Sequence, residues 1–242
     1  MLDREAVYRA SIAEDTIVEA GARVGLQYHP DAGEAVIGSG GIIRSGTIIY
    51  GDVRAGDYFQ TGHNAVVRAK VRFGDYCCVF HGSTIEGLVR MGRGVRVMAH
   101  VYIPSRTWFG DNVFVGPGVV FLNDKSAARY ASLTERAIRG ATVEDDAAIG
   151  GGAVILPGVR IGARSFIAAG ALVTKDVPPD SLAIGTPARI EPLPEHLRGT
   201  NSPDVCIQPR DIWHPLTDDL NGLDWPAEWP EQWSADSPGG SS

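Results

Sequence analysis

The sequence has little cysteine and no long apolar run. Its three cysteines are Cys77, Cys78 and Cys206, and no two of them have the spacing of a zinc motif. Cys77 and Cys78 are adjacent, so their side chains point to opposite sides of an extended strand, which disfavours a disulfide between them. No segment approaches the length of a membrane span, and the first residues, MLDREAVYRA, lack the apolar stretch of a signal peptide. We therefore expect a cytoplasmic, reduced protein with no membrane partner.

An excess of positive charge is also missing. The net charge is −7, and residues 190–242 alone contain ten acidic and two basic residues, a balance of −8 that leaves about +1 for residues 1–189. Neither part has the basic surplus that is typical of nucleic-acid binding. We therefore expect no nucleic-acid partner.

A repeat of six residues dominates what is present. From Ile37 to Phe121 every sixth residue is apolar or carries a ring or methyl group, and only Ala55 and Thr61 are weak members. The fifteen positions are Ile37, Ile43, Ile49, Ala55, Thr61, Val67, Phe73, Val79, Ile85, Met91, Val97, Ile103, Phe109, Val115 and Phe121. The residue four places after each is usually small or β-branched, and Phe59 is the exception.

A period of six matches neither an α-helix nor a single alternating strand. It is typical of short strands joined by tight corners, three to a coil of about 18 residues, with neighbouring coils stacked as parallel strands roughly 4.8 Å apart. Gly46, Asp52 and Asn64 are among the residues that suit corners with positive φ. The sequence therefore predicts an all-β fold, a parallel β-helix of hexapeptide repeats with a narrow triangular core.

The repeat is interrupted twice. One extra residue between Val24 and Ile37 predicts that residues 28–33 bulge out. Residues 122–141 lose the period, which resumes at Val143, so we interpret this segment as an excursion from a continuous solenoid. A regular scaffold positions its excursions, and we expect this one to carry function rather than to be a tolerated surface insertion.

The chain is predicted to have two parts. Residues 1–189 form the β-helix, and the prolines within residues 175–187 end its coils. Residues 190–242 form an acidic extension that holds four of the five tryptophans. A disordered segment rarely contains so many tryptophans, so we expect part of the extension to pack on the solenoid or on a neighbouring subunit, and only its last residues to be disordered.

Three histidines are predicted to form a column on one corner of the coils. His63 and His81 are 18 residues apart and therefore stack, and His100 follows one place along the next coil. A neutral imidazole can accept a proton from an attacking amine or hydroxyl, three imidazoles can bind Zn²⁺, and corner histidines can simply hydrogen-bond to a turn. The γ-class carbonic anhydrases share this kind of solenoid but use two histidines five residues apart, a pair that this sequence lacks. No metal is therefore expected.

Two stretches resemble the hexapeptide-repeat acyltransferases, namely FGDNVFVGPGVVFLNDK and TVEDDAAIGGGAVILPGVRIGARSFIAAGALVTKDVPPDSLAIGTPAR. The resemblance covers about residues 15–190, and VFVGPGVVFLND is similar to the branch that N-acetylates amino groups of nucleotide-linked sugars. It implies a left-handed β-helix that assembles as a homotrimer. It also implies acetyl-CoA as co-substrate along the C-terminal coils, with active sites between subunits.

The resemblance assigns the coenzyme A contacts residue by residue. Gly151 and Ala169 match positions whose backbone meets the pantetheine arm, and their small size lets a ligand approach the wall. Thr174 and Lys175 match the pair near the adenosine phosphates. Arg189 matches a second basic contact there, which suits the negative charge of coenzyme A.

The acceptor side is less similar to the family. The loop LNDKSAAR lacks the histidine that sugar O-acetyltransferases have there, whereas Asn123 and Asp124 match the amino-sugar branch. His100 stands where that branch usually has asparagine, so it is either a base or a substrate contact. We predict His100, with His81 in reserve, as the catalytic residues, and Asn123, Asp124 and His63 as substrate-binding residues.

The predicted activity is acetyl transfer from acetyl-CoA to the amino group of a nucleotide-linked sugar. The alternatives are an acyltransferase for another small amine or hydroxyl, a metal protein like the γ-carbonic anhydrases, and a non-catalytic scaffold.

Overall fold

The structure is a computed structural model that describes residues 6–127, 129, 138–199 and 201. The chain divides into two compact units, Met1–Ile207 and Gln208–Ser242. The second unit lies wholly outside the described residues, and with it the four tryptophans of the extension and its last residues, for which the predictions remain predictions.

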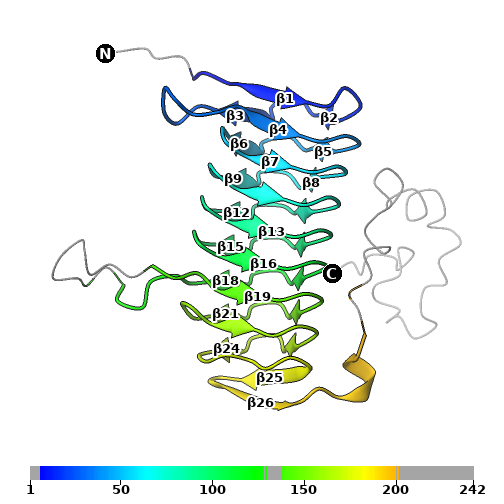
Figure 1. The fold of residues 1–242 in the computed structure, drawn as a ribbon, viewed down its shortest axis with the longest axis vertical. Helices are drawn as coiled ribbons and strands as arrows, with labels where there is room; N and C mark the ends of the chain where they lie inside the picture. The colour runs from blue at the N-terminus through cyan, green and yellow to red at the C-terminus, as the bar shows by residue number, and fades with distance from the viewer. Residues whose placement is uncertain (1–5, 128, 130–137, 200, 202–242) are drawn as a thin grey trace, which may run out of the picture. The chain divides into compact units, whose positions relative to one another are not determined.

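Three sheets form the three walls of a β-helix (Figure 1). The first sheet consists of β1 (Ala10–Ile12), β4 (Ala35–Ile37), β7 (Arg54–Ala55), β10 (Arg72–Phe73), β13 (Arg90–Met91), β16 (Trp108–Phe109), β19 (Thr142–Val143) and β22 (Arg160–Ile161). The second consists of β2 (Ile17–Val18), β5 (Ile42–Ile43), β8 (Gln60–Thr61), β11 (Cys78–Val79), β14 (Arg96–Val97), β17 (Phe114–Val115), β20 (Ala148–Ile149), β23 (Phe166–Ile167), β25 (Ser181–Gly185) and β26 (Ala188–Pro192). The third consists of β3 (Arg23–Leu26), β6 (Ile48–Tyr50), β9 (Val66–Val67), β12 (Thr84–Ile85), β15 (Tyr102–Ile103), β18 (Val120–Phe121), β21 (Val154–Ile155) and β24 (Leu172–Val173).

Consecutive strands of the repeat belong to consecutive sheets, and each pairs in parallel with the strand one coil later. The predicted all-β hexapeptide solenoid is therefore confirmed. After the last coil, β26 folds back antiparallel on β25, and a short 3₁₀ helix, η2 (Glu195–Leu197), follows.

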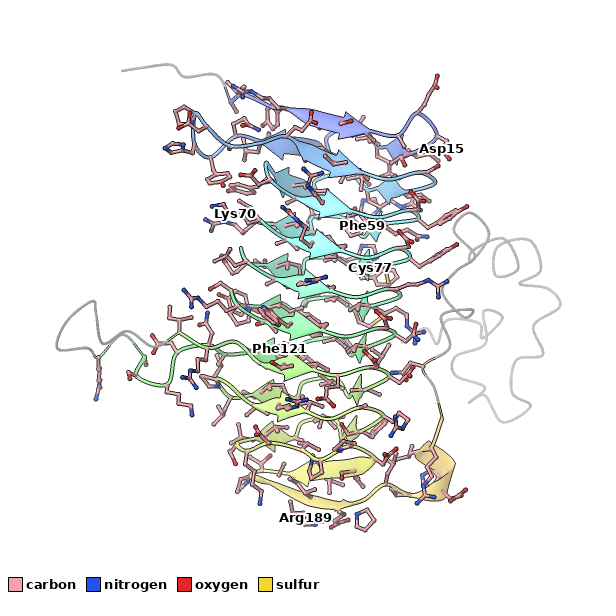
Figure 2. The ribbon with its side chains drawn as sticks, viewed as in Figure 1. Asp15, Phe59, Lys70, Cys77, Phe121 and Arg189 are labelled. Atoms are coloured by element: carbon pink, nitrogen blue, oxygen red, sulfur yellow. The ribbon has the colours of Figure 1, made fainter. Side chains whose placement is uncertain are left out.

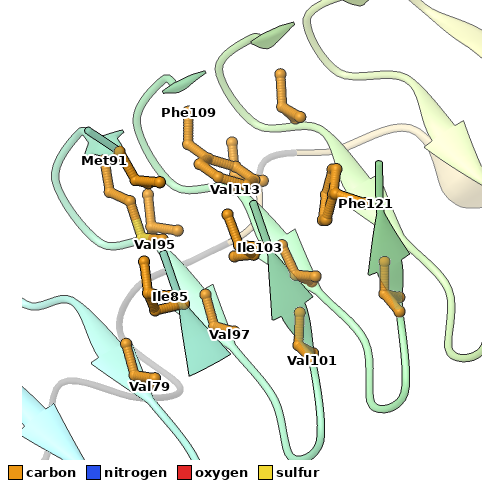
Figure 3. Close-up of a cluster of buried hydrophobic side chains, with 14 of the residues drawn as sticks. Val79, Ile85, Met91, Val95, Val97, Val101, Ile103, Phe109, Val113 and Phe121 are labelled. Atoms are coloured by element: carbon orange, nitrogen blue, oxygen red, sulfur yellow. The ribbon is translucent and has the colours of Figure 1, made fainter. Parts of the chain in front are cut away.

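The ladder residues point inward and form the core. Ile49 and Ile85 are completely buried, and Figure 3 shows the same stacking between Val79 and Phe121. On each two-residue strand the other side chain points outward, because successive side chains alternate across a strand. Each coil thus adds one apolar layer to a continuous column, and burial of these layers is what stabilises the solenoid.

Phe59 compensates for the weak ladder members of its coil. Ala55 and Thr61 contribute little volume, whereas the fully buried Phe59 ring lies 4.6 Å from the ring centroid of Phe73. The buried Thr61 hydroxyl is satisfied, because its Oγ1 accepts the N–H of Arg44 at 2.9 Å. The large Phe59 side chain therefore fills the core volume that Ala55 and Thr61 leave empty in the same layer.

Each pair of walls meets at a corner of two turn residues, and each corner forms a column. The aspartate corner joins the first sheet to the second and contains Asp75 and Asp111. The histidine corner joins the second sheet to the third and contains His63 and His81. The excursion corner joins the third sheet to the first, and residues 122–141 leave the solenoid there.

The excursion begins and ends as a short paired stem. Asp124 and Ile138 form an antiparallel bridge, and the N–H of Arg139 donates to the carbonyl oxygen of Asn123 at 2.8 Å. The first sheet runs past the stem without a gap, because β16 pairs with β19. Residues 128 and 130–137 of the excursion lie outside the described residues.

The loop between β3 and β4 stands on the same corner, several coils nearer the N-terminus. The Tyr28 hydroxyl donates to Oδ2 of Asp52 at 2.7 Å, and the N–H of Gly33 donates to Oδ1 at 3.0 Å. The bond from Tyr28 is the main reason that the pKa of the Asp52 carboxyl is held below its usual value. The Asp52 carboxylate is therefore already engaged by this loop.

Two adjacent residues of β4 test the inward ladder directly. Ile37 is buried, whereas Val36 points outward and is only partly buried. We expect Ile37→Ala to lower the free energy of unfolding by about 2–5 kcal/mol and Val36→Ala to lower it by less than half as much. Urea denaturation at equal protein concentrations measures both, and equal losses would contradict the inward assignment.

Candidate functional site at the histidine corner

His63 and His81 stack on each other, as the 18-residue spacing predicts. Their ring centroids are 5.5 Å apart and the ring planes differ by 15°. Both occupy the first turn position of their coils, and His100 occupies the second turn position of the next coil. All three side chains are exposed, so a ligand at this corner can reach them.

Hydrogen bonds define what two of the imidazoles can do. The N–H of His63 donates to Nδ1 of His81 at 2.9 Å, so a neutral His81 carries its proton on Nε2 and presents a donor outward. Nδ1 of His63 lies 2.9 Å from the Ser45 hydroxyl and 3.8 Å from the Glu19 carboxylate. A hydrogen bond from Arg44 is the main reason that the pKa of Glu19 lies below its usual value, so an anion stands behind His63.

His100 is held differently. Its backbone has a φ of 59°, and its ring lies against Gly82, where a Cβ would be 2.7 Å from Nδ1 of His100. The glycine is therefore what makes room for the ring. Within the described residues the His100 side chain has no hydrogen bond or ion pair, so both ring nitrogens can serve a substrate.

On the coils that follow His81, the first turn positions of the same corner carry only small side chains or proline, and we call this surface the strip. The first turn positions are Ala99, Pro117, Gly151 and Ala169 in successive coils. Backbone bonds of 2.9 Å join the coils here, including the bond from the N–H of Gly170 to the carbonyl oxygen of Gly151. The structure thus brings two predicted coenzyme A contacts, Gly151 and Ala169, into one column with the predicted histidines.

The strip also presents unpaired N–H groups. At the aspartate corner several of the first N–H groups of the turns are capped by an aspartate of the next coil: the N–H of Asp57 donates to Oδ1 of Asp75 at 2.9 Å, and that of Arg93 to Asp111 at 2.8 Å. At the histidine corner the Ser45 N–H is capped by Glu19 and the His63 N–H by His81, whereas the coils that follow offer only alanine, proline or glycine. From the coil of His81 towards the C-terminus, the N–H groups of His81, Ala99, Gly151 and Ala169 have no hydrogen-bond partner among the described residues, and Pro117 between them has no N–H.

The other predicted coenzyme A contacts lie at the C-terminal end of the solenoid. Thr174 and Lys175 follow β24, so they stand on the excursion side of the last coil. Arg189 lies on β26 (Figure 2), and its guanidinium pairs with the Glu191 carboxylate. The turn before β26 is tied to the strip, because the Thr186 hydroxyl donates to the carbonyl oxygen of Gly170 at 3.2 Å.

The predicted substrate residues Asn123 and Asp124 do not lie at the histidine corner. They follow β18 and therefore stand at the opposite edge of the third sheet. The Asn123 amide donates to the carbonyl oxygen and to the hydroxyl of Ser105, both at 3.1 Å, and so anchors the excursion to the coil above. Within one chain the predicted site is thus divided between two corners.

Sequence reasoning missed a hollow of about 640 Å³ on the first sheet beside the excursion corner. Arg72, Arg90 and Trp108 of successive coils line it. The signal was present in the sequence, since Arg54, Arg72, Arg90 and Trp108 are spaced by 18 residues. They stand at outward positions, next to the inward ladder.

Two further features bear on the possible chemistry. Among residues 6–127 and 138–199, no group of three histidine, cysteine or acidic side chains is arranged to hold a metal ion. Cys77 is buried, and this burial raises the pKa of its thiol to about 12, which makes the thiol a poor nucleophile. In the described residues no helix is long and apolar enough to cross a membrane.

Comparisons with known proteins agree with the repeat. The family described as bacterial transferase hexapeptide (six repeats) matches residues 140–175. A hexapeptide-repeat-containing acetyltransferase of Vibrio cholerae, solved with acetyl coenzyme A, is 32% identical over 57% of this chain and 72% of its own, with a TM-score of 0.41. The galactoside O-acetyltransferase of Lactococcus lactis is 33% identical over 38% of this chain and 42% of its own. The chain spans between 30% and 42% of the length of the curated relatives that it matches.

The fold itself is shared with the UDP-N-acetylglucosamine acyltransferase of Francisella novicida. That structure is 19% identical and covers 78% of this chain and 70% of its own, with a TM-score of 0.59. The architecture is a left-handed parallel β-helix, as the resemblance implied. The chain belongs to the hexapeptide-repeat transferase family.

Proposed function

We propose that the protein is an acetyl-CoA-dependent N-acetyltransferase that acts on the amino group of a nucleotide-linked sugar. The observation that carries the proposal is the row of unpaired N–H groups that descends from His81 to Ala169. The three coil steps from Ala99 to Ala169 span roughly 14 Å at about 4.8 Å each. An extended arm with amide carbonyls, as in coenzyme A, can accept hydrogen bonds from such a row.

The polarity of the strip orients the cofactor. Lys175 and Arg189 stand at the C-terminal end, where they suit the phosphates of coenzyme A. The thioester then lies at the other end of the strip, beside His81 and His100. This orientation places the reacting carbonyl next to imidazoles and leaves the small residues to accommodate the arm.

Acetyl transfer needs only the thioester, the acceptor amine and the imidazoles of His81 and His100. The neutral amine attacks the thioester carbonyl carbon, the carbon–sulfur bond of the tetrahedral intermediate breaks, and the proton lost by the amine ends on the coenzyme A thiol. His100 accepts the amine proton, and the Nε2–H of His81 donates to the oxygen on which negative charge develops. The base contributes roughly tenfold to a hundredfold, because an amine can also lose its proton to water beforehand.

A homotrimer packed through the third sheet would reunite the divided site. The outward residues of this sheet are mostly apolar, and Val120, Val154 and Leu172 form part of the row. Rotation about a threefold axis brings the excursion corner of one chain against the histidine corner of the next. Asn123 and Asp124 of one subunit would then face His100 of its neighbour.

Acetyl-CoA binding tests the strip. Ala169→Leu places a branched side chain on it, so we expect the Kd for acetyl-CoA to rise at least tenfold in isothermal titration calorimetry. Ala163→Leu is the matched control, because Ala163 holds the same turn position at the aspartate corner. An unchanged Kd in Ala169→Leu would remove the strip from the cofactor site.

Removal of the His100 imidazole tests the acceptor step. His100→Gly has no backbone cost, since Gly82 and Gly118 hold the same turn position with positive φ in the adjacent coils. We expect kcat/KM for a nucleotide-linked amino sugar to fall roughly tenfold to a hundredfold while the Kd for acetyl-CoA stays the same. Thioester consumption with a panel of such sugars gives the rates, and His196→Ala controls for loss of a remote histidine. Full activity in His100→Gly would exclude His100 from the site.

The oligomeric state tests the third-sheet contact. Val120→Glu introduces charge into the apolar row, and we expect the mass in light scattering to fall from three times the 25.8 kDa of one chain to that of one chain. Val36→Glu, the same substitution on the outward face of the first sheet, should leave the trimer intact. Loss of the trimer in both variants, or in neither, would contradict this arrangement.

A further inference from the structure

The hollow on the first sheet is lined by five cationic side chains. Lys70 and Arg106 come from the excursion corner, Arg72 and Arg90 from the outward face of the sheet, and Arg139 from the stem of the excursion. Among the described residues, no acidic side chain lines this hollow. A chain whose net charge is −7 thus concentrates positive charge in a single hollow of about 640 Å³.

Most of these cations lack a carboxylate partner within the described residues, although the charges of Lys70 and Arg72 contribute to lowering the pKa of the Asp52 carboxyl. Within the described residues, Lys70, Arg90, Arg106 and Arg139 make no ion pair. Arg72 donates to the backbone carbonyl of Asp52, whose carboxylate is engaged by Tyr28 and Gly33.

Some arginines elsewhere on the solenoid have carboxylate partners: Arg44 pairs with Glu19, Arg160 with Glu144 and Arg164 with Asp180. Arg72 and Arg90 are direct neighbours in the first sheet, where like charges roughly 4.8 Å apart disfavour pairing. The charge in the hollow is therefore a cost to the solenoid that an anionic ligand would relieve.

An aromatic ring stands at the end of the arginine row. Trp108 pairs in register with Arg90 on one side and with Thr142 on the other, and it is 59% exposed. Its indole and the exposed Leu88 give the hollow an apolar side next to the charged one. A planar ring beside several guanidinium groups is the combination that holds a base by stacking and its phosphates by charge.

We propose that this hollow binds a nucleoside diphosphate group, with the base stacked on Trp108 and the phosphates held by Arg72, Arg90 and the corner cations. The volume is that of a small-molecule site rather than a track for a nucleic-acid strand. The hollow borders the excursion corner, which the proposed trimer places against the histidine corner of the next chain. The inference therefore rests on the proposed function in one respect only: the proposed function makes the diphosphate the part of the sugar acceptor that the hollow holds.

Binding of nucleoside diphosphates to the full-length protein tests the proposal without any turnover. Equilibrium dialysis with UDP, dTDP, CDP, GDP and ADP should give saturable binding of at least one of them, weakened by salt. Arg90→Gln should raise the Kd of that diphosphate roughly 10- to 100-fold, and Trp108→Ala should raise it roughly 5- to 100-fold. Arg54→Gln is the matched control, since Arg54 holds the same strand position two coils away and does not line the hollow; its Kd should change less than twofold.

The outcomes separate this inference from the proposed function. If a diphosphate binds in the expected way but no nucleotide-linked amino sugar is acetylated, the hollow stands and the proposed activity fails. If acetylation occurs but neither Arg90→Gln nor Trp108→Ala affects diphosphate binding, the inference is wrong and the activity stands. It is also wrong if none of the five diphosphates binds, or if acetyl-CoA displaces the diphosphate and loses affinity equally in Arg90→Gln, because the hollow would then hold the phosphates of the cofactor.

Discussion

Backbone hydrogen bonding between successive coils is the constraint on which the rest of the structure depends. Each strand donates and accepts across a fixed step of one coil, as in the bonds from the N–H of Cys78 to the carbonyl of Val95 and from Arg96 to Val113. Because the step is fixed, a residue type that recurs at this step becomes a vertical column. Inward columns form the core, and outward columns decide what each wall and corner can bind.

A column of like residues is stable only if its charges and donors are satisfied. The aspartate corner achieves this in part, since Asp75 and Asp111 each cap an N–H of the preceding coil, and Arg93 interrupts the acidic row with its guanidinium 4.9 Å from the ring centroid of Tyr76. The histidine corner below His81 leaves its N–H groups uncapped, and the first-sheet hollow leaves its arginines unpaired. These two departures occur on opposite sides of the third sheet, and both are chemically complementary to parts of one reaction, a coenzyme arm and a phosphorylated acceptor.

Counting along the sequence could predict the columns but not their surroundings. The inward ladder, the stacking of His63 on His81 and the alignment of Gly151 with Ala169 all follow from spacing alone. Spacing could not show that the Asn123 amide is used to anchor the excursion on Ser105, because that bond depends on the path of the chain after β18. Nor could it separate Arg160, which has a carboxylate partner, from Arg90, which has none among the described residues, although both recur in the same outward row.

The geometry of a solenoid also accounts for the proposed separation between binding of the acceptor at the hollow and acetyl transfer at the histidine corner. A wall of two-residue strands is flat, so a strip such as the histidine corner offers donors but no enclosure, and a cleft for the thioester needs a second chain. A hollow formed by a single chain lies where the excursion stem rises above the first sheet, with Ile138 and Arg139 forming its side. A single chain can therefore bind the diphosphate group of the proposed substrate. In the proposed trimer the chemical step depends on assembly, so disruption of the third-sheet contact should abolish acetyl transfer before it abolishes binding at the hollow.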